Sequence, residues 1–201
     1  ILAAVLVVAF TTVVTMCMVD GITKKSVAAM LGTIIGVVFS GAFALIFGQV
    51  TSITGYNVSD IENLVYVGEM TDIKIGELLF AGILIASLGA VMDVGMSIAS
   101  TLNELKEQNP QMMLKELFQS GMNVGRDMMG TMTNTLILAF TGGSINTLVF
   151  IFAYNYEYQQ VINMYSVGIE IMQGLSSSLG VIMAVPVTSW IAAFLYSKNQ
   201  K

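Results

Sequence analysis

The segment Leu88–Leu105, LGAVMDVGMSIASTLNEL, places a carboxylate inside a run that otherwise has the composition of a membrane-spanning helix. Asp93 has Leu, Met, Val and Ile around it, and a charged side chain near the middle of a bilayer costs a few kcal/mol on insertion scales. Steps of three and four residues along the helix from Asp93 trace a row of small or polar residues, namely Gly82, Ala86, Gly89, Ser97, Ser100 and Glu104. One face of this helix therefore suits another helix or water, and the opposite face suits lipid.

The composition is that of an integral membrane protein. Of the 201 residues, 55% are hydrophobic and only 10% are charged, whereas about a quarter of the residues of a soluble domain are charged. The strict alternation of transmembrane β-strands is absent, so we expect an all-α, polytopic transmembrane bundle. The sequence has no His and a single cysteine, Cys17. We therefore expect no zinc or haem site, no other metal and no cofactor.

Five segments are long enough to cross a hydrocarbon core of roughly 30 Å, which needs about 20 residues per helix. We place the spans at residues 1–19, 27–50, 78–101, 121–141 and 167–196 of a single transmembrane domain, 1–201. Lysines follow the first span and the last span, and the positive-inside rule puts these ends in the cytoplasm. The acidic segment 51–76 is then an outside loop.

The segments between the spans carry their own signals. In the outside loop, Ser59 with Glu62 matches a capping box, and Thr71 is suited to cap a second helix. Residues 110–120 have Pro110 at the first helical position, with apolar side chains on one side of the helix and charged ones on the other. This pattern predicts a cytoplasmic amphipathic helix along the membrane surface. Residues 144–166 are polar and aromatic, and we expect an interfacial segment there.

The span 121–141 is very polar for a membrane helix. Asn123, Asp127, Gly130 and Asn134 share one face, and Arg126 lies beside it. Asp93 and Asp127 each lie six or seven residues from the cytoplasmic end of their spans, or roughly 10 Å at 1.5 Å per residue. Two antiparallel neighbours would present these carboxylates at similar depth.

Small residues and one proline mark the expected helix packing. Gly32 and Gly36 form a small-xxx-small pattern that lets two helix backbones approach closely, and Gly89 and Gly130 are suited to the same role. Pro186 removes one backbone hydrogen bond from the last span and predicts a kink.

The polar residues of the two unusual spans predict a proton relay in a transporter or exporter. A carboxylate desolvated by burial has a raised pKa, which suits a group that carries protons. Asp93 is the candidate relay residue. The residues predicted to tune it are Asp127, Arg126 and Asn134, and those predicted to line the path are Ser97 and Thr131.

Two alternatives stay open at this stage. The polar faces could serve only helix–helix contact in a non-transporting membrane scaffold that docks partners. Two aspartates on adjacent spans could also form the acid–base pair of an intramembrane aspartyl protease. LGAVMD lacks the Gly-x-Gly-Asp pattern of such proteases, however, and no Tyr precedes Asp127. Phosphate-binding loops, nucleophile elbows and nucleic-acid surfaces are absent, so we expect neither an enzyme nor a nucleic-acid partner.

Residues 102–143, LNELKEQNPQMMLKELFQSGMNVGRDMMGTMTNTLILAFTGG, with GAVMDVGMSIAS before them, resemble the signature of the YibE/F family of bacterial multipass membrane proteins. The resemblance continues more loosely to the closing VPVTSWIAAFLYSK and covers most of the chain. It implies a location in the bacterial inner or plasma membrane, with the lipid bilayer as surroundings. It implies little about function, because the role of the family is unassigned.

A weaker resemblance is to the transmembrane half of exporters of the resistance-nodulation-division superfamily and of the SecD/SecF subunits. The order of Gly89-x-x-x-Asp93, a helix with an acidic end, the helix after Pro110 and the Thr-rich residues 131–135 is similar to theirs. The resemblance implies that Asp93 relays protons. These 201 residues lack the large extracytoplasmic domain of those exporters. We therefore expect a homo-oligomer or a hetero-oligomer with a related family member.

Overall fold

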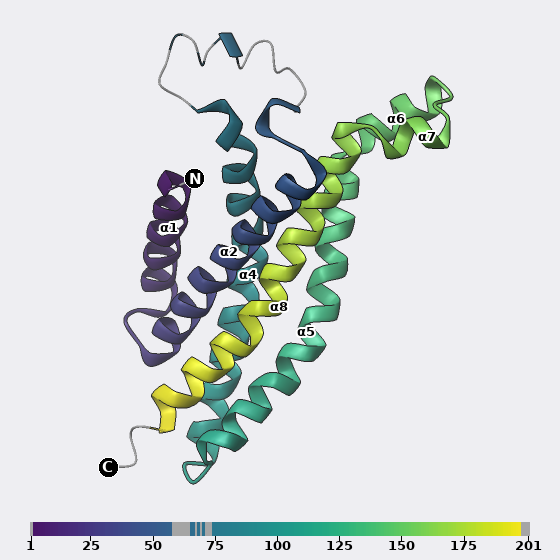
Figure 1. The fold of residues 1–201 in the computed structure, drawn as a ribbon. Coiled ribbons are helices and arrows are strands. Elements are labelled where there is room, and N and C mark those ends of the chain that lie inside the picture. Colours follow the sequence, from purple (N-terminus) through teal and green to yellow (C-terminus); the bar gives the residue numbers. More distant parts are fainter. Residues whose placement is uncertain (1, 58–64, 67, 69, 71–73, 198–201) are drawn as a thin grey trace.

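The computed structural model describes residues 2–57, 65, 66, 68, 70 and 74–197. These residues form a bundle of helices and contain no strand (Figure 1). The all-α prediction is therefore confirmed. In chain order, the elements are α1 (Leu2–Asp20), α2 (Lys24–Thr51), the short 3-10 helix η1 (Gly55–Asn57), α4 (Ile75–Gln108), α5 (Leu114–Gly143), α6 (Ile145–Ala153), α7 (Tyr158–Ile162) and α8 (Tyr165–Ser197).

Four helices are long and apolar enough to cross a bilayer, namely α1, α2, α4 and α8. A fifth candidate is the pair of α5 and α6, which is bent by 54°. The predicted span 27–50 lies inside α2, 78–101 inside α4 and 167–196 inside α8. Each helix extends past the predicted limits of its span, because the backbone keeps its intrahelical hydrogen bonds beyond the apolar stretch.

The turn between α1 and α2 is built by residues 20–26. Gly21 has φ +68°, in the left-handed region that a side chain would make unfavourable. The backbone N–H of Ser26 donates to Oγ1 of Thr23 at 3.1 Å, so Thr23 caps α2. The Lys25 ammonium pairs with the Asp20 carboxylate across the turn. These local interactions reverse the chain and place α1 beside α2 (Figure 1).

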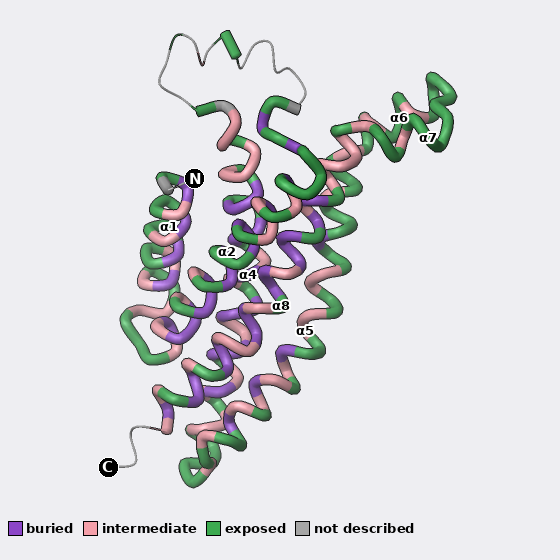
Figure 2. Tube along the Cα trace, viewed as in Figure 1, coloured by how far each residue is buried: buried purple, intermediate pink, exposed green. Residues whose placement is uncertain are grey.

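The centre of the bundle is α8, which packs against α2, α4 and α5, while α1 packs on α2 and α4. The contact faces carry fully buried side chains such as Val91, Ile98 and Val185. Figure 2 shows the buried residues on the inward sides of α2, α4 and α8. The outward sides are exposed over most of their length, as expected for helices that a bilayer surrounds.

The start of α5 differs from the prediction. We expected a separate surface helix over 110–120, but α5 begins at Leu114 and continues unbroken to Gly143. The Lys106 ammonium donates to the carbonyl oxygens of Pro110 at 2.8 Å and Met112 at 2.9 Å, which holds residues 109–113 in a turn. The helix continues past 120 because Gly121 fits closely against α8, where a Cβ would lie 2.7 Å from Oγ of Ser189.

The predicted interfacial segment 144–166 contains α6 and α7, which project beyond the end of the main bundle (Figure 1). Its three central tyrosines are all exposed. On the same side, α2 ends at Thr51 and α4 begins at Ile75, close to the limits of the predicted outside loop. The capping residues predicted in that loop, Ser59, Glu62 and Thr71, lie outside the described residues.

Candidate functional site

The face of α4 that carries Asp93 points away from the bundle. Its small and polar residues are exposed at the surface of the chain, and Ser97 is half-buried. The exposed residues are Gly82, Ala86, Gly89, Asp93, Ser100 and Glu104. A Cβ added to Gly82 or Gly89 would meet no atom within 4 Å. The described part of the chain therefore leaves this face, which we call the α4 polar face, without a neighbouring helix.

Asp93 lies at hydrocarbon depth for any position of the bilayer along α4. The helix has 34 residues, and a window of roughly 20 residues fills the hydrocarbon core. Every such window that fits within Ile75–Gln108 includes Asp93. The carboxylate is thus both inside the membrane layer and on the outer surface of the single chain.

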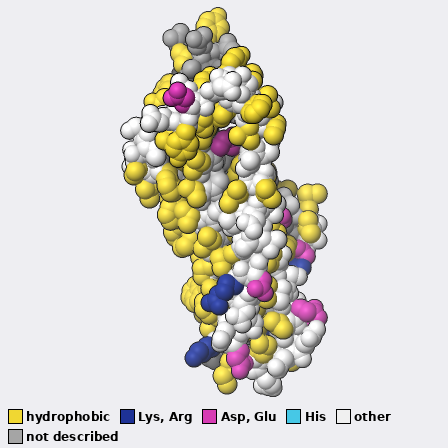
Figure 3. All heavy atoms as spheres, turned by 90° about the vertical axis from the view of Figure 1, so that its right-hand side faces the viewer, with side chains coloured by type: hydrophobic (Ala, Val, Ile, Leu, Met, Phe, Trp, Pro, Cys, Tyr) yellow, Lys and Arg dark blue, Asp and Glu magenta, His cyan; other side chains and the backbone are white. Residues whose placement is uncertain are grey.

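A second polar face lies on α5, and we call it the α5 polar face. Asn123, Asp127, Gly130, Thr131 and Asn134, which form it, are all exposed, and so is the neighbouring Arg126. Figure 3 shows the molecule from the side that is on the right in Figure 1, where α5 lies, with the backbone and uncharged polar side chains in white between yellow apolar areas and most charged side chains in the lower half.

The charged pair Arg126 and Asp127 lies in the first half of α5, which makes the fifth candidate span together with α6. The pair lies in the hydrocarbon core where the roughly 20 residues that fill it belong to α5 alone. A Cβ on Gly130 would meet nothing within 4 Å. This face too is left open by the described part of the chain.

The structure does not bring the two aspartates together as a buried pair. The sequence predicted that antiparallel neighbours would present Asp93 and Asp127 at similar depth, and in the structure both are exposed. No ion pair or side-chain hydrogen bond involves Asp93, Asp127 or Arg126 within the described ranges. The reason is the packing: α4 and α5 meet through apolar contacts, such as that of Ile98 with Gly125, where a Cβ would lie 3.2 Å from the isoleucine Cδ1.

The hydroxyl groups of α5 are engaged within their own helix. Oγ1 of Thr131 donates to the carbonyl oxygen of Asp127 at 3.3 Å, and Oγ1 of Thr135 donates to that of Thr131 at 3.0 Å. Such back-bonding satisfies the hydroxyl donor in an apolar environment, while its oxygen can still accept a hydrogen bond. Asn134 has no side-chain partner among the described residues, so its amide is available on the α5 polar face.

The predicted packing residues fall into two groups. Gly32 and Gly36 lie against α8, where added Cβ atoms would come within 1.9 Å of Thr188 and 2.9 Å of Ala184, respectively. The other two glycines, Gly89 and Gly130, lie on the open polar faces instead. Pro186 lies inside α8, which continues on both sides of it.

The sequence did not reveal a set of buried hydroxyls between α2, α4 and α8. Oγ1 of Thr33 and of Thr188 are buried without a hydrogen-bond partner among the described residues. A Cβ on Gly95 of α4 would lie 3.0 Å from the first oxygen and 3.6 Å from the second. Threonines are common in membrane helices, so no sequence signal distinguishes these two from hydroxyls on other faces.

The described residues contain no group of three or more His, Cys, Asp or Glu side chains able to hold a metal ion. The chemistry available on the two polar faces is that of isolated carboxylates, one guanidinium, two amides and a few hydroxyls. These groups can exchange protons and form ion pairs with an approaching chain.

The comparisons with known proteins give a family. The model of the family described as YibE/F-like protein matches residues 1–198, nearly the whole chain. No curated protein and no solved structure matches the chain, and the resemblance to exporter halves stays a prediction. The family match agrees with the four to five helices able to cross a bilayer. The chain is therefore a multipass membrane protein that belongs to the YibE/F-like protein family.

Proposed function

We propose that this protein is a component of a proton-coupled transporter or exporter in the bacterial cell membrane, and not an enzyme. The observation that supports the proposal is the Asp93 carboxylate, which lies without a partner among the described residues on the outer surface of a helix that can cross the bilayer. In this proposal, Asp93 relays protons. Asp127, Arg126 and Asn134 tune the relay, and Ser97 and Thr131 line the path.

The proposal includes an assembly of chains. An ionised side chain that faces lipid costs a few kcal/mol, and α4 and α5 each present one or more such residues. A second copy of the chain, or a related family member, would cover these faces and enclose Asp93 with Asp127 and Arg126. Since opposite charges occur on the faces, two copies can pair a carboxylate with a guanidinium across the interface.

A relay needs water at Asp93, and water access is measurable. In a Cys17→Ser background, we expect Ser97→Cys and Ser100→Cys to react with a membrane-impermeant thiol reagent in intact vesicles. Both positions lie on the α4 polar face next to Asp93. The modified fraction is measured by mass spectrometry after labelling from each side.

The control is Ile85→Cys on the same helix, because Ile85 is 54% exposed but lies outside the α4 polar face. We expect little reaction there. If neither Ser97→Cys nor Ser100→Cys reacts from either side, the relay proposal is wrong. That result would favour a non-transporting scaffold whose polar faces serve only contact between chains.

Association is expected to depend on the α5 polar face. Replacing Gly130 by leucine should convert the assembly in detergent to a single chain, because a bulky side chain prevents close approach of a partner helix. The chain itself should stay folded, since a Cβ at Gly130 meets no atom within 4 Å. Glycine is also about 1 kcal/mol less favourable than other helix formers. Native mass spectrometry reports the change in oligomeric state.

The matched control is Ala42→Leu on the exposed side of α2, which adds comparable volume away from both polar faces. This variant should keep the wild-type oligomeric state. Two results would contradict the proposal: a wild-type protein that is already a single chain in lipid nanodiscs, or a Gly130→Leu variant that associates as the wild type does.

A further inference from the structure

A cavity of about 330 Å³ lies where the end of α5, the start of α6 and the start of α8 meet. It is at the end of the bundle from which α6 and α7 project (Figure 1). Its volume falls in the range of small-molecule sites. It is separate from the α4 polar face, none of whose residues line it.

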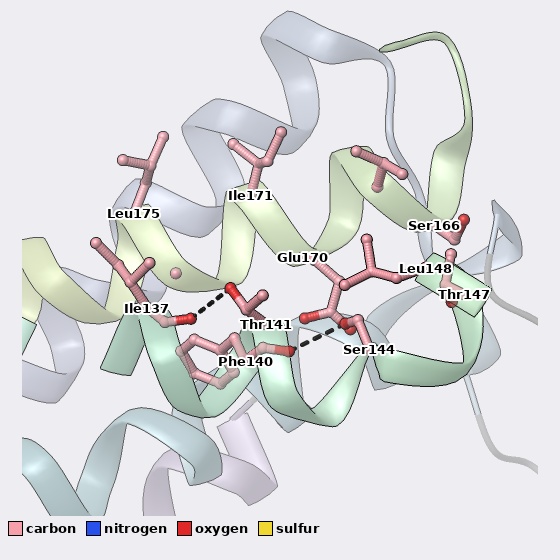
Figure 4. A pocket seen from close by; sticks show the side chains of 12 residues that line it. Ile137, Phe140, Thr141, Ser144, Thr147, Leu148, Ser166, Glu170, Ile171 and Leu175 are labelled. Atoms are coloured by element: carbon pink, nitrogen blue, oxygen red, sulfur yellow. Dashed lines mark hydrogen bonds between the residues drawn. The ribbon is translucent and has the colours of Figure 1, made fainter. Parts of the chain in front are cut away.

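The lining of this cavity is mostly apolar, with four hydroxyl side chains and one ionisable side chain. Glu170 of α8 is the only charged residue among those that line it. Figure 4 shows the Glu170 carboxylate beside Ser144, between α8 and the junction of α5 with α6. The apolar side chains of the lining are Ile137, Phe140, Leu148, Val167, Ile171 and Leu175.

The Glu170 carboxylate has no donor within the described part of the chain. It makes no ion pair or hydrogen bond there. Two of the hydroxyls that line the cavity donate to backbone carbonyls instead of to Glu170. Thr141 Oγ1 donates to the carbonyl of Ile137 at 2.7 Å, and Ser144 Oγ donates to that of Phe140 at 3.1 Å. A half-buried carboxylate in an apolar cavity is stabilised by a cation.

The elements around the cavity cannot supply that cation. Residues 144–197, which include α6, α7 and α8, contain no Lys or Arg, and the nearest basic residue before them in sequence is Arg126. A cation beside Glu170 would therefore come from outside these elements, and a bound ligand can supply it. Glu170 lies in the second turn of α8, so a ligand can keep its charge near the membrane interface and its apolar body among the side chains.

We propose that this cavity binds a lipophilic monocation, an organic molecule with an apolar body and a single amine, ammonium or phosphonium group. Glu170 provides the countercharge, and the aromatic and aliphatic side chains of α5 and α8 hold the body. The site goes beyond the proposed proton relay, because binding at equilibrium needs neither Asp93 nor transport.

The test uses two ions of similar size and shape and of opposite charge. The full chain in phosphatidylglycerol nanodiscs is dialysed against radiolabelled tetraphenylphosphonium or tetraphenylborate, and binding to empty nanodiscs is subtracted. We expect saturable binding of the phosphonium alone. Glu170→Gln should weaken it roughly ten- to a hundredfold, the loss of one charge-assisted contact. Glu157→Gln, which removes an exposed carboxylate of the same projecting end, should leave it unchanged.

A steric variant tests the position independently of charge. Gly174 lines the cavity, and an added Cβ would lie 3.7 Å from Cδ2 of Phe140, which is ordinary contact. Gly174→Ala should therefore bind as the wild type does, while Gly174→Leu should fill the cavity and abolish binding with Glu170 still present. The proposal would be overturned if tetraphenylborate bound as tightly as tetraphenylphosphonium. It would also be overturned if Glu170→Gln and Gly174→Leu both kept the wild-type affinity for the phosphonium.

The same chemistry could come from a lipid, the ammonium headgroup of phosphatidylethanolamine. Adding this lipid to the nanodiscs separates the two sources. Competition that raises the apparent Kd of the phosphonium in proportion to the lipid fraction supports a lipid as the resident ligand. An unchanged Kd supports a free lipophilic cation. If Asp93→Asn does not alter proton flux, the proposed relay is wrong, but the binding results at Glu170 still stand.

Discussion

Replacing Gly32 by alanine is expected to destabilise the bundle strongly. The added Cβ would lie 1.9 Å from Oγ1 and 2.8 Å from Cβ of Thr188, and 3.2 Å from its backbone Cα. Because a backbone atom is among the contacts, a rotamer change cannot remove the clash, and α2 and α8 must separate. Overpacking of this kind costs roughly 1 to 3 kcal/mol and occasionally more. Thermal unfolding in dilute detergent should show a clearly lower Tm.

The matched control for this prediction is Gly82→Ala on α4. A Cβ there meets no atom within 4 Å, and alanine is about 1 kcal/mol more favourable than glycine within a helix. The control should therefore keep or raise the Tm. Thr188→Ala should partly rescue Gly32→Ala, because it removes the closest atom. An unchanged Tm for Gly32→Ala would show that α2 and α8 do not pack through this contact.

Replacing Asp93 by asparagine is expected to abolish proton movement through the assembled protein. Asparagine has nearly the same shape but does not exchange a proton, so the relay proposed for α4 would lose its carrier. Proteoliposomes that hold a pH-sensitive dye are given a potassium diffusion potential, and proton uptake is followed. Wild-type vesicles should take up protons faster than protein-free vesicles, and the variant should match the protein-free rate.

Two further variants make this experiment specific. Asp93→Glu keeps an ionisable group at the same place and should retain measurable uptake. Glu104→Gln removes a carboxylate from the predicted cytoplasmic end of the same face, beyond the predicted limit of the span at Thr101, and should behave as the wild type. Its hydrogen bond with Gln108, 2.8 Å in the structure, can be kept by an amide. Wild-type uptake by Asp93→Asn would contradict a relay at this residue.

The helical periodicity of the sequence determined which residues share a face, and this held in the structure. Gly82, Ala86, Gly89 and Ser100 do lie together with Asp93 on the outside of α4. The same periodicity placed Asp127 and Asn134 on one side of α5. Such inferences succeed because a face depends on the geometry of one helix alone.

The direction of each face was decided by tertiary packing. Gly32 and Gly89 both belong to stripes of small residues, yet the first meets α8 and the second meets no atom within 4 Å. A stripe of small residues allows close approach whether the partner is in the same chain or in another. The sequence did not determine whether Asp93 and Asp127 meet, and in the structure apolar contacts such as that of Ile98 with Gly125 turn both polar faces outward.

The cavity at Glu170 also shows what the sequence determined and what depended on the tertiary structure. The sequence by itself determined a helical membrane protein with charges in two spans, since hydrophobicity and periodicity are properties of local segments. In the sequence, Glu170 is one polar residue within the span predicted at 167–196, and no pattern distinguishes it. Tertiary structure alone brought residues 137–148 of α5 and α6 against residues 166–175 of α8 around one cavity. Contacts between segments so far apart depend on how whole helices pack, and no local pattern specifies them.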